Sequence, residues 1–328
     1  MARWAILGTG FISQTVAQAI QAHPRSELLT IAGRNADRVA DFQAKFDIPK
    51  TSIGYEDALA DPEVDIVYIG LPNHVHHTLT AQAAAAGKPV LSEKSLTTTM
   101  DQAAELVAAV RAHDTFFVEG FMYLAHPLYQ RLTEVLTDGR LGKLRSIHGF
   151  YSAAISNVTN PLGRGTIYNL GCYPASLAHL VVQVMEGEGA FASARLGGFG
   201  VTEPDHGTLV DAAVTAKIGD VLVNLHSTDS YGMAHEFVIA GECGTLKFLT
   251  NPWRPNAGDN RILWQPYKGE GEEIVVNTGQ DDFYHQVAMV EANVAAGNRE
   301  ASRPSPRIQD SLEIMAFLTQ WEALCLKG

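Results

Sequence analysis

The sequence predicts an α/β protein in two domains: an N-terminal Rossmann-type, doubly wound parallel sheet, then an α+β domain with a large, open and mainly antiparallel sheet. Three observations predict this. Residues 1–122 alternate between short apolar strand-like runs and helix-like segments, the order typical of a parallel sheet covered on both faces. Residues 123–328 are dominated by longer stretches of alternating hydrophobicity. The 328 residues also exceed the usual size of one core.

In the first domain, strands and helices are read from apolar periodicity and from the Gly and Pro residues that interrupt it. The strand-like runs are 4–7, 28–32, 64–69, 89–91 and 116–118, and the helices are expected over 15–22, 35–46, 78–86 and 100–113. Pro24 ends the first helix, and Gly87 closes the alanine-rich third one.

The second domain is expected to carry substrate binding and oligomerisation. Strands are predicted over 144–151, 208–218, 221–230, 236–240 and 245–249, and helices over 127–136, 174–185, 283–296 and 309–326. Gly219 and Asp220 form a hairpin turn between two strands. Pro174 occupies a tolerated first-turn position of its helix. We expect the last helix, 309–326, to pack back on the first domain.

Composition excludes several classes of protein. The net charge of −12 argues against a nucleic-acid partner, because a phosphate backbone needs a basic surface. Three widely spaced cysteines give neither a disulfide framework nor a zinc-ligand spacing. No apolar run is long enough for a membrane span, and the first residues lack a signal-peptide pattern. A cytoplasmic protein with a small-molecule substrate is expected.

A glycine-rich turn follows the first strand and opens the first helix, the context that a dinucleotide-binding fingerprint requires. The residues are Gly8, Thr9, Gly10, Phe11 and Ile12. The first glycine permits the tight turn, the second lets backbone approach a pyrophosphate, and the helix N-terminus attracts anions. Ser13 stands at the third glycine position, where we expect slightly looser packing of helix on strand.

The end of the second strand favours NADP(H) over NAD(H). NAD-binding proteins usually carry Asp or Glu there, bonded to the ribose hydroxyls. Here Arg34 occupies the position, and Arg38 follows one helical turn later. Guanidinium groups bind a 2′-phosphate with paired hydrogen bonds, and no carboxylate is present to repel it.

The third strand is followed by a loop expected to cover the nicotinamide ribose, since ligands lie at the carboxyl ends of such strands. It contains Leu71, Pro72, Asn73 and His76. His76 is the candidate substrate contact in this loop. The three histidines in the segment have no acidic or thiol partner nearby in sequence, so no metal site is predicted.

Further motifs resemble the Gfo/Idh/MocA oxidoreductase family over nearly the whole chain. Glu93-Lys94 follows the fourth strand where that family carries Glu-Lys-Pro, and the glycine turn and Pro72-Asn73 fit as well. Gly171-Cys172-Tyr173 resembles the Gly-x-Tyr of the branch containing dimeric dihydrodiol dehydrogenase, NADP-dependent D-xylose dehydrogenase and glucose–fructose oxidoreductase. Two departures stand out. Ser95 replaces the proline, whose peptide bond is often cis in the family, and Asn169 replaces an Asp.

The resemblance implies that Lys94 and Tyr173 are the catalytic pair, with Tyr173 exchanging the substrate proton. A lysine ammonium about 4 Å from a phenol contributes at most about 4 kcal/mol at an effective dielectric of about 20. That energy would lower a tyrosine pKa of about 10 toward the working pH. Glu93 and Lys94 are also expected beside the cofactor. The substrate side is expected to include His76, Lys94, Tyr123, Arg164, Tyr168, Asn169 and Tyr173. For Arg164, Tyr168 and His235 a purely structural role stays open.

The resulting hypothesis is an NADP(H)-dependent dehydrogenase or reductase acting on the CH–OH or C=O group of a sugar, polyol or dihydrodiol. Two alternatives stay open: reduction of other small carbonyl or dicarbonyl compounds, and a catalytically silent NADP-binding regulator on the same fold. Retention of both Lys94 and Tyr173 argues against the silent regulator. In this family the open sheet face often forms a subunit interface, so a homodimer or homotetramer through the C-terminal sheet is expected.

Overall fold

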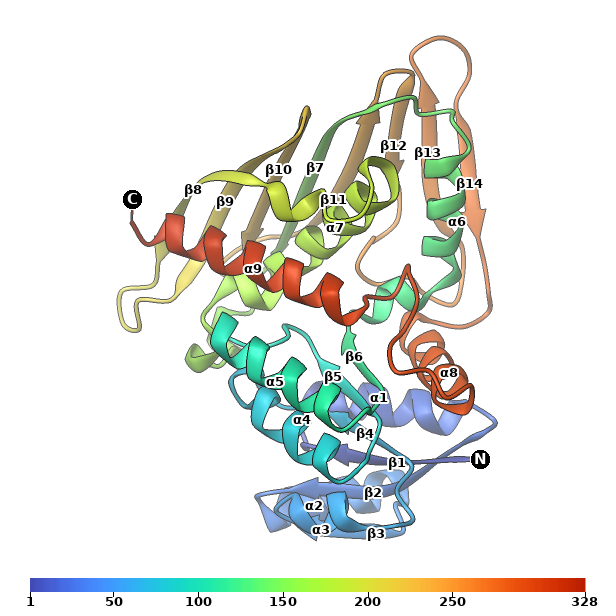
Figure 1. The fold of residues 1–328 in the computed structure, drawn as a ribbon, viewed down its shortest axis with the longest axis vertical. Helices are drawn as coiled ribbons and strands as arrows, with labels where there is room; N and C mark the ends of the chain where they lie inside the picture. The colour runs from blue at the N-terminus through green and yellow to red at the C-terminus, as the bar shows by residue number, and fades with distance from the viewer. Residues whose placement is uncertain (328) are drawn as a thin grey trace. The chain divides into compact units, whose positions relative to one another are not determined.

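The computed structural model describes residues 1–327, which form two compact units (Figure 1). The first unit contains Met1–Met122 and Phe283–Ile308, and the second contains Tyr123–Asp282 and the residues from Gln309 onward. The first change of unit coincides with the expected boundary after residue 122. The segment Phe283–Ile308, expected with the second domain, is grouped with the first.

The first unit contains a six-stranded parallel sheet in the order β3-β2-β1-β4-β5-β6. This is the order of a dinucleotide-binding Rossmann sheet, and it confirms the predicted fold class. Its strands are β1 Ala2–Leu7, β2 Ser26–Gly33, β3 Lys50–Ile53, β4 Ile66–Ile69, β5 Val90–Glu93 and β6 Phe117–Gly120. Its helices are α1 Phe11–Ala22, α2 Ala36–Phe46, α3 Glu56–Ala60, α4 His76–Ala85, α5 Met100–Ala112 and, later in the chain, α8 Asp282–Ala295, and the 3₁₀ turn η1 is Asn73–Val75.

Helix α8 is attached to this unit by a buried polar cluster around Glu291. The Trp4 indole N–H donates to Glu291 Oε1 at 2.9 Å, and His23 Nδ1 lies 3.3 Å from Glu291 Oε2. The backbone N–H of Phe117 donates to the carbonyl of Arg299 at 3.1 Å. These contacts explain why a segment so late in the chain belongs to the first unit.

The second unit contains an eight-stranded mixed sheet in the order β14-β13-β12-β11-β7-β10-β9-β8. Every neighbouring pair is antiparallel except β7 and β10, which confirms the mainly antiparallel prediction. The strands are β7 Leu144–Ala153, β8 Arg195–Thr202, β9 Leu209–Ile218, β10 Val221–Thr228, β11 Met233–Gly241, β12 Gly244–Phe248, β13 Asn260–Pro266 and β14 Glu272–Val276.

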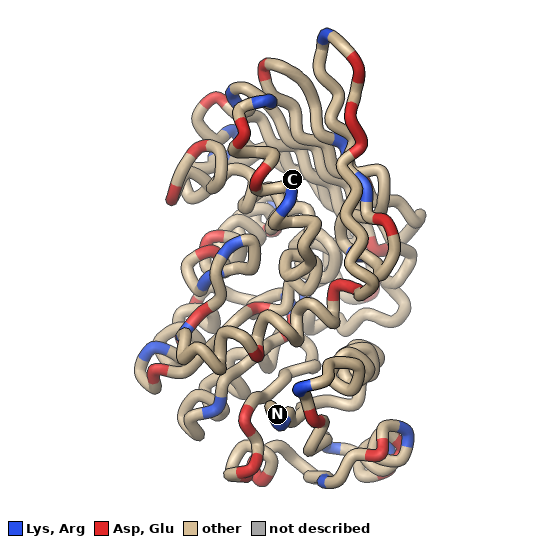
Figure 2. The backbone as a smooth tube through the Cα atoms, turned by 90° about the vertical axis from the view of Figure 1, so that its right-hand side faces the viewer, with Lys and Arg blue, Asp and Glu red and all other residues tan. Residues whose placement is uncertain are grey.

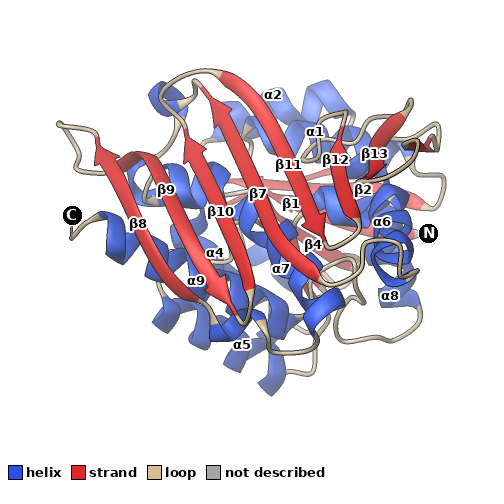
Figure 3. Cartoon of the chain, turned by 90° about the horizontal axis from the view of Figure 1, so that it is seen from above, coloured by secondary structure: helices blue, strands red, loops and turns tan. Residues whose placement is uncertain are grey.

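Helix α7 (Cys172–Glu186) lies against β7 and β10, while Figure 3 looks onto the face of the sheet that α7 leaves uncovered. The close approach depends on Gly149, because a Cβ there would lie 2.9 Å from the Cβ of Pro174. The other helices of this unit are α6 Pro127–Thr137, α9 Ile308–Cys325, the π-helix η5 Ile167–Gly171, and the 3₁₀ turns η2 Met122–Ala125, η3 Ser156–Val158, η4 Pro161–Gly163 and η6 Phe191–Ser193.

Helix α9 belongs to the second unit from Gln309 onward, and its expected packing on the first domain stays a prediction. Phe317 packs on Phe191 with ring centroids 4.9 Å apart. A Cβ on Gly171 would lie 3.1 Å from the Trp321 ring, so this helix sits directly on the turn that precedes α7.

Acidic and basic positions are interspersed along the tube in Figure 2. Among residues 1–327, no helix combines the length and apolarity needed to cross a membrane. Within the same residues, no cluster of three or more His, Cys, Asp or Glu side chains is arranged to hold a metal ion.

Candidate active site

The glycine turn after β1 is shaped to receive an anion. Gly8 has a φ of +112°, and a Cβ there would lie 2.6 Å from the carbonyl oxygen of Gly70. Gly10 is the N-cap of α1, and a Cβ there would meet no atom within 4 Å. The first-turn N–H groups of α1 have no acceptor within the helix, and the helix dipole favours negative charge there. This arrangement fits the pyrophosphate of a dinucleotide.

Ser13 packs tightly at the third glycine position, contrary to the expectation of loosened packing. Its side chain is fully buried, and its hydroxyl donates to the carbonyl of Gly70 at 3.4 Å. A Cβ on Gly70 would lie 2.3 Å from Ser13 Oγ. The glycine after β4 therefore compensates for the serine in α1, a pairing between distant positions that one sequence does not reveal.

Arg34 directly follows β2, and Arg38 lies in the first turn of α2. Arg34 and Arg38 are exposed, and the N-cap residue Asn35 accepts a hydrogen bond from the Arg38 backbone N–H at 2.9 Å. Burial raises the pKa of Tyr55, while the neighbouring Arg34 guanidinium acts in the opposite direction. A cavity of about 250 Å³ is lined by Thr9, Gln14, Arg38, Asp41, Phe42 and Lys45. Arg34, Arg38 and Lys45 could hold an anionic group of a bound cofactor here, and Asp41 adds a carboxylate to the cavity lining.

The loop after β4 holds His76 in the interior. His76 is fully buried, with Nε2 2.7 Å from the carbonyl of Leu71 and Nδ1 3.0 Å from the carbonyl of Ser95. Burial lowers the pKa of His76 to about 4, against the weaker opposing effect of these carbonyls. The imidazole is therefore neutral at pH 7, and its single N–H donates to one of these two carbonyls. This placement does not support the expected substrate contact by His76. Pro72 is exposed and Asn73 is buried at the start of η1.

Lys94 directly follows the last residue of β5 and is only partly buried. The preceding Glu93 is buried, and its Oε1 accepts a hydrogen bond from the Tyr68 hydroxyl at 2.9 Å. Its Oε2 lies 3.3 Å from the Lys94 backbone N–H. The Lys94–Ser95 peptide bond is cis, the isomer that the resemblance implies for a proline at this position. Glu93 thus holds the backbone at Lys94, and its buried carboxylate does not have the exposure expected of a cofactor contact.

Tyr173 lies in the first turn of α7 among aromatic side chains. Its ring centroid is 5.4 Å from Tyr151, 5.9 Å from Tyr123 and 6.2 Å from Trp253. Tyr173 is 7% exposed, so most of its ring is shielded from water. Sequence reasoning missed Tyr151 and Trp253. Tyr151 ends a predicted strand, and Trp253 lies in a segment for which the sequence predicted neither a strand nor a helix.

Tyr123, which was expected to contact the substrate, is fully buried, and its ring packs against that of Tyr173. Its hydroxyl lies 2.7 Å from Ser176 Oγ and donates to the Tyr173 carbonyl at 3.3 Å. These contacts give Tyr123 a structural role in positioning the start of α7.

Arg164 and Tyr168 are bound to a carboxylate on α9. Arg164 Nε and Nη2 lie 2.9 and 2.7 Å from the two oxygens of Glu322, and the Tyr168 hydroxyl donates to Glu322 Oε2 at 2.9 Å. Burial raises the pKa of Glu322, and Arg164 opposes that effect. These contacts favour the structural role that the sequence left open for both residues. Nothing in the sequence paired either residue with Glu322.

Asn169 donates from Nδ2 to Asp229 Oδ2 at 3.1 Å. Although the resemblance implied that Asn169 removes a negative charge, Asp229 supplies one from the segment after β10. In the same unit, an ion pair joins Arg254 Nε to the buried Asp282 carboxylate at 3.2 Å. Neither Asp229 nor Arg254 was singled out from the sequence. His235, on β11, is exposed.

Comparison with known proteins gives consistent results for both units. Residues 2–121 match the family described as an oxidoreductase family with an NAD-binding Rossmann fold, and residues 129–247 match the GFO/IDH/MocA C-terminal domain. The trans-1,2-dihydrobenzene-1,2-diol dehydrogenase of Sus scrofa is 30% identical over 295 residues, which cover 86% of this chain and 85% of that protein.

Two solved structures share the fold. The 3-ketoreductase KijD10 from Actinomadura kijaniata, in complex with NADP and TDP-benzene, has a TM-score of 0.86 and 24% identity, covering 98% of this chain and 97% of that chain. The aldose-aldose oxidoreductase from Caulobacter crescentus, complexed with glycerol, has a TM-score of 0.83 and 19% identity, covering 100% and 98%. Because both fall below 25% identity, they show the fold alone. Together with the sequence matches, the glycine turn after β1 and the two sheets show that the chain is an NAD(P)-binding member of the Gfo/Idh/MocA oxidoreductase family.

Proposed function

We propose that this protein is an NADP(H)-dependent oxidoreductase that interconverts a CH–OH group and a C=O group on a sugar, polyol or dihydrodiol-like substrate. One observation carries the proposal: Lys94 follows β5 at the same carboxyl edge of the parallel sheet as the glycine turn after β1. A cation at that edge lies on the side where dinucleotides bind in such sheets. The relative that is named for a dihydrobenzene diol supports the diol part of this substrate class.

NADP(H) is the proposed cofactor because of the residues around the end of β2. Gly8 and Gly10 would face the pyrophosphate, and the exposed aromatic ring of Phe11 begins α1 beside them. Arg34 and Arg38 would hold the 2′-phosphate. Ser13 and Gly70 keep α1 close to the sheet, so the N–H groups in the first turn of the helix would have a fixed position toward the phosphates.

When bound, the nicotinamide supplies the two-electron chemistry by accepting or donating a hydride. The role of Lys94 would be to donate a hydrogen bond to the substrate oxygen and stabilise negative charge there. Tyr173 would exchange the proton with that oxygen, as a general acid in reduction and a general base in oxidation. Tyr151 and Trp253 would exclude water from the Tyr173 hydroxyl.

The direct test is NADPH absorbance with purified protein, measured in both directions on aldoses, inositols, dihydrodiols and dicarbonyls, with NAD(H) in parallel. The proposal predicts turnover on a sugar, polyol or diol that depends on NADP(H). Turnover that prefers NAD(H) would contradict the cofactor assignment. Turnover on dicarbonyls only would move the substrate to that class, and cofactor binding without any turnover would favour a non-catalytic regulator.

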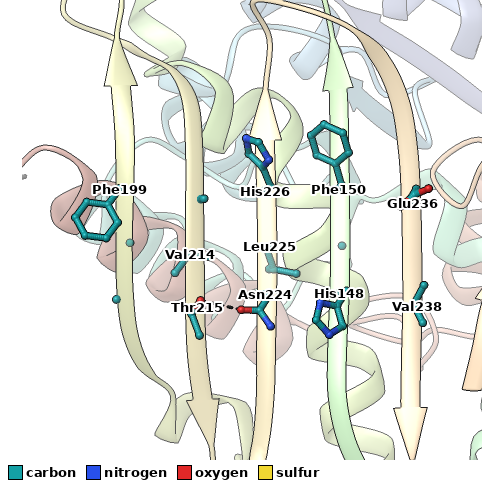
Figure 4. A pocket seen from close by; sticks show the side chains of 14 residues that line it. His148, Phe150, Phe199, Val214, Thr215, Asn224, Leu225, His226, Glu236 and Val238 are labelled. Carbon is teal, nitrogen blue, oxygen red and sulfur yellow. Dashed lines mark hydrogen bonds between the residues drawn. The ribbon is translucent and has the colours of Figure 1, made fainter.

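We also propose that the uncovered sheet face pairs with a second copy of the chain, giving a homodimer or homotetramer. Large apolar side chains are exposed on it, including Phe199 (80%), Val201 (60%) and Leu222 (47%). A cavity of about 390 Å³ lies on this face, and Figure 4 shows Phe199 on β8, His226 on β10, Phe150 on β7 and Val238 on β11 around it. The His226 and Phe150 rings stack with centroids 4.8 Å apart. A surface of stacked rings and aliphatic side chains suits a protein partner.

A further inference from the structure

A cavity of about 410 Å³ lies wholly within the second unit, between the segment 156–161, the β8–β9 loop and the start of β9. Hydroxyl and amide side chains, among them Ser156, Thr159, Asn160 and Thr208, dominate its lining. Asp229, just after β10, completes the wall. The volume falls within the range of small-molecule sites, and the polar lining differs from the apolar walls typical of them.

Asp229 is held firmly in this wall. Its backbone N–H donates to the Val210 carbonyl at 3.0 Å, and its carbonyl accepts from the N–H groups of Ile155 at 2.9 Å and Ser156 at 2.8 Å. The side chain is 1% exposed. Asp229 therefore joins both sides of the cavity, and its carboxylate has a fixed position.

One oxygen of this carboxylate has no donor. Oδ2 accepts from Asn169, whereas Oδ1 is buried and no hydrogen-bond partner for it occurs among residues 1–327. Burial raises the pKa of the Asp229 carboxyl. A buried carboxylate oxygen without a donor is costly, and a ligand that donates a hydrogen bond to it removes that cost.

The charges around the cavity restrict which ligand can be that donor. Among the described residues that line it there is no Lys or Arg, His206 is the one basic side chain, and Glu203 adds a second carboxylate to the lining. A phosphate or nucleoside diphosphate would therefore meet two negative groups with no lysine or arginine to balance them. A neutral molecule with several hydroxyl groups matches both the donors and the acceptors of the wall.

We infer that Asp229 is a specificity-determining residue that accepts a hydrogen bond through Oδ1 from a hydroxyl of an unphosphorylated sugar or polyol bound in this cavity. The inference rests on the proposed oxidoreductase function, whose substrate it narrows. Asn169, the partner of Asp229, lies four residues before Tyr173, so the cavity wall is joined to the segment that carries the proposed proton-exchanging group.

The test uses the full chain loaded with NADP and two probes, D-glucose and D-glucose 6-phosphate, with affinities measured by ligand-observed NMR titration. Wild type should bind glucose at least about tenfold more tightly than the phosphate ester. Asp229→Asn should weaken glucose binding about 10- to 100-fold, the range expected for one hydrogen bond to a charged group. Asp205→Asn is the matched control, since it removes the same charge from the β8–β9 loop at a residue that does not line the cavity.

A swapped variant, Asn169→Asp with Asp229→Asn, separates ligand binding from a purely structural role. The swap keeps one amide and one carboxylate side by side, so a structural pair would regain both thermal stability and glucose affinity. Our inference predicts recovered stability with glucose binding still weak. It is overturned if the swap restores binding, if Asp229→Asn binds glucose like wild type, or if wild type binds neither probe or prefers the phosphate ester.

Turnover distinguishes this inference from the proposed function. If wild type oxidises or reduces sugars and Asp229→Asn raises KM for the sugar with kcat nearly unchanged, the result supports both the role of Asp229 and the proposed function. If turnover occurs and KM for the sugar is the same in Asp229→Asn, the inference fails and the function stands. If glucose binding depends on Asp229 but no substrate of the panel turns over, the function fails and the binding site stands.

Discussion

The Tyr123 hydroxyl donates a hydrogen bond to the backbone carbonyl of Tyr173 at 3.3 Å and lies 2.7 Å from Ser176 Oγ. This hydrogen bond holds the first turn of α7 in position. We expect Tyr123→Phe to lower the free energy of unfolding by about 1 kcal/mol, the usual net value of one hydrogen bond. Because the Tyr173 backbone loses a support, kcat should fall several-fold while KM for NADPH stays unchanged.

The control for that variant is Tyr129→Phe. Tyr129 belongs to the same aromatic cluster, with its ring centroid 4.9 Å from that of Tyr123, but its hydroxyl donates to the Pro252 carbonyl. It should lose similar stability in denaturant titration and keep its kcat. Equal kcat losses in both variants would show that Tyr123 has no particular effect on Tyr173.

Arg34 should determine the preference for NADP. Replacing it with Ala removes one charge-assisted hydrogen bond to the proposed 2′-phosphate, which is worth about 1.5–3 kcal/mol. KM for NADPH should therefore rise about 10- to 100-fold in steady-state assays, and KM for NADH should change little. Arg131→Ala, an exposed arginine of the second unit, is the control. A similar loss for both cofactors would contradict the assigned role.

His76 should make the stability of the protein depend on pH. Its folded-state pKa is about 4, below the ordinary value of 6.5, because burial favours the neutral ring. The associated stability is therefore present above pH 6.5 and is lost as the pH falls from there toward 4. The expected loss of unfolding free energy is about 3 kcal/mol over this window.

Denaturant titrations at several pH values between 7 and 4 check this behaviour. His76→Gln removes the titrating group, so its stability should change less over the same window. An equal pH dependence in the variant and in wild type would show that other groups cause it.

Phe199 should stabilise the proposed subunit contact. An aspartate at this position places a charge in the middle of an apolar surface, where desolvation is costly. Light scattering coupled to gel filtration should give two or four chains for wild type and a larger share of single chains for Phe199→Asp. Val158→Asp, at another exposed apolar residue outside the sheet, should keep the wild-type mass. Wild type that elutes as a single chain would contradict the contact.

The sequence was sufficient to predict the parallel sheet and most of its helices, because buried parallel strands give continuous apolar runs and the glycine turn has a strong local pattern. It was insufficient for β3, β8, β13 and β14, and β8 contains three glycines, which weaken a strand pattern. The strand β3 is four residues long and only partly buried, and β14 has a single buried residue, Ile274, among its five. Such short strands depend on pairing with neighbours that local periodicity does not specify.

For the candidate site too, local sequence patterns predicted some residues and missed the contacts of others. Local patterns placed the glycine turn and the arginines of the first unit, and Lys94 followed from the family resemblance. They could not foresee that Arg164 and Tyr168 bind Glu322, or that Asn169 binds Asp229, because these partners are distant in sequence. For His76, a histidine after a strand predicted a ligand contact, whereas the ring is buried between two backbone carbonyls inside the fold.

The central claim is that Tyr173 exchanges the substrate proton, and Tyr173→Phe tests it most directly. The variant keeps the aromatic packing with Tyr151 and Trp253 and removes only the hydroxyl. On the best substrate of the panel, the rate of NADPH oxidation in a single turnover should fall about 10²- to 10⁴-fold, the range for general acid–base catalysis, with unchanged affinity for NADPH. A single-turnover rate equal to that of wild type would contradict the account.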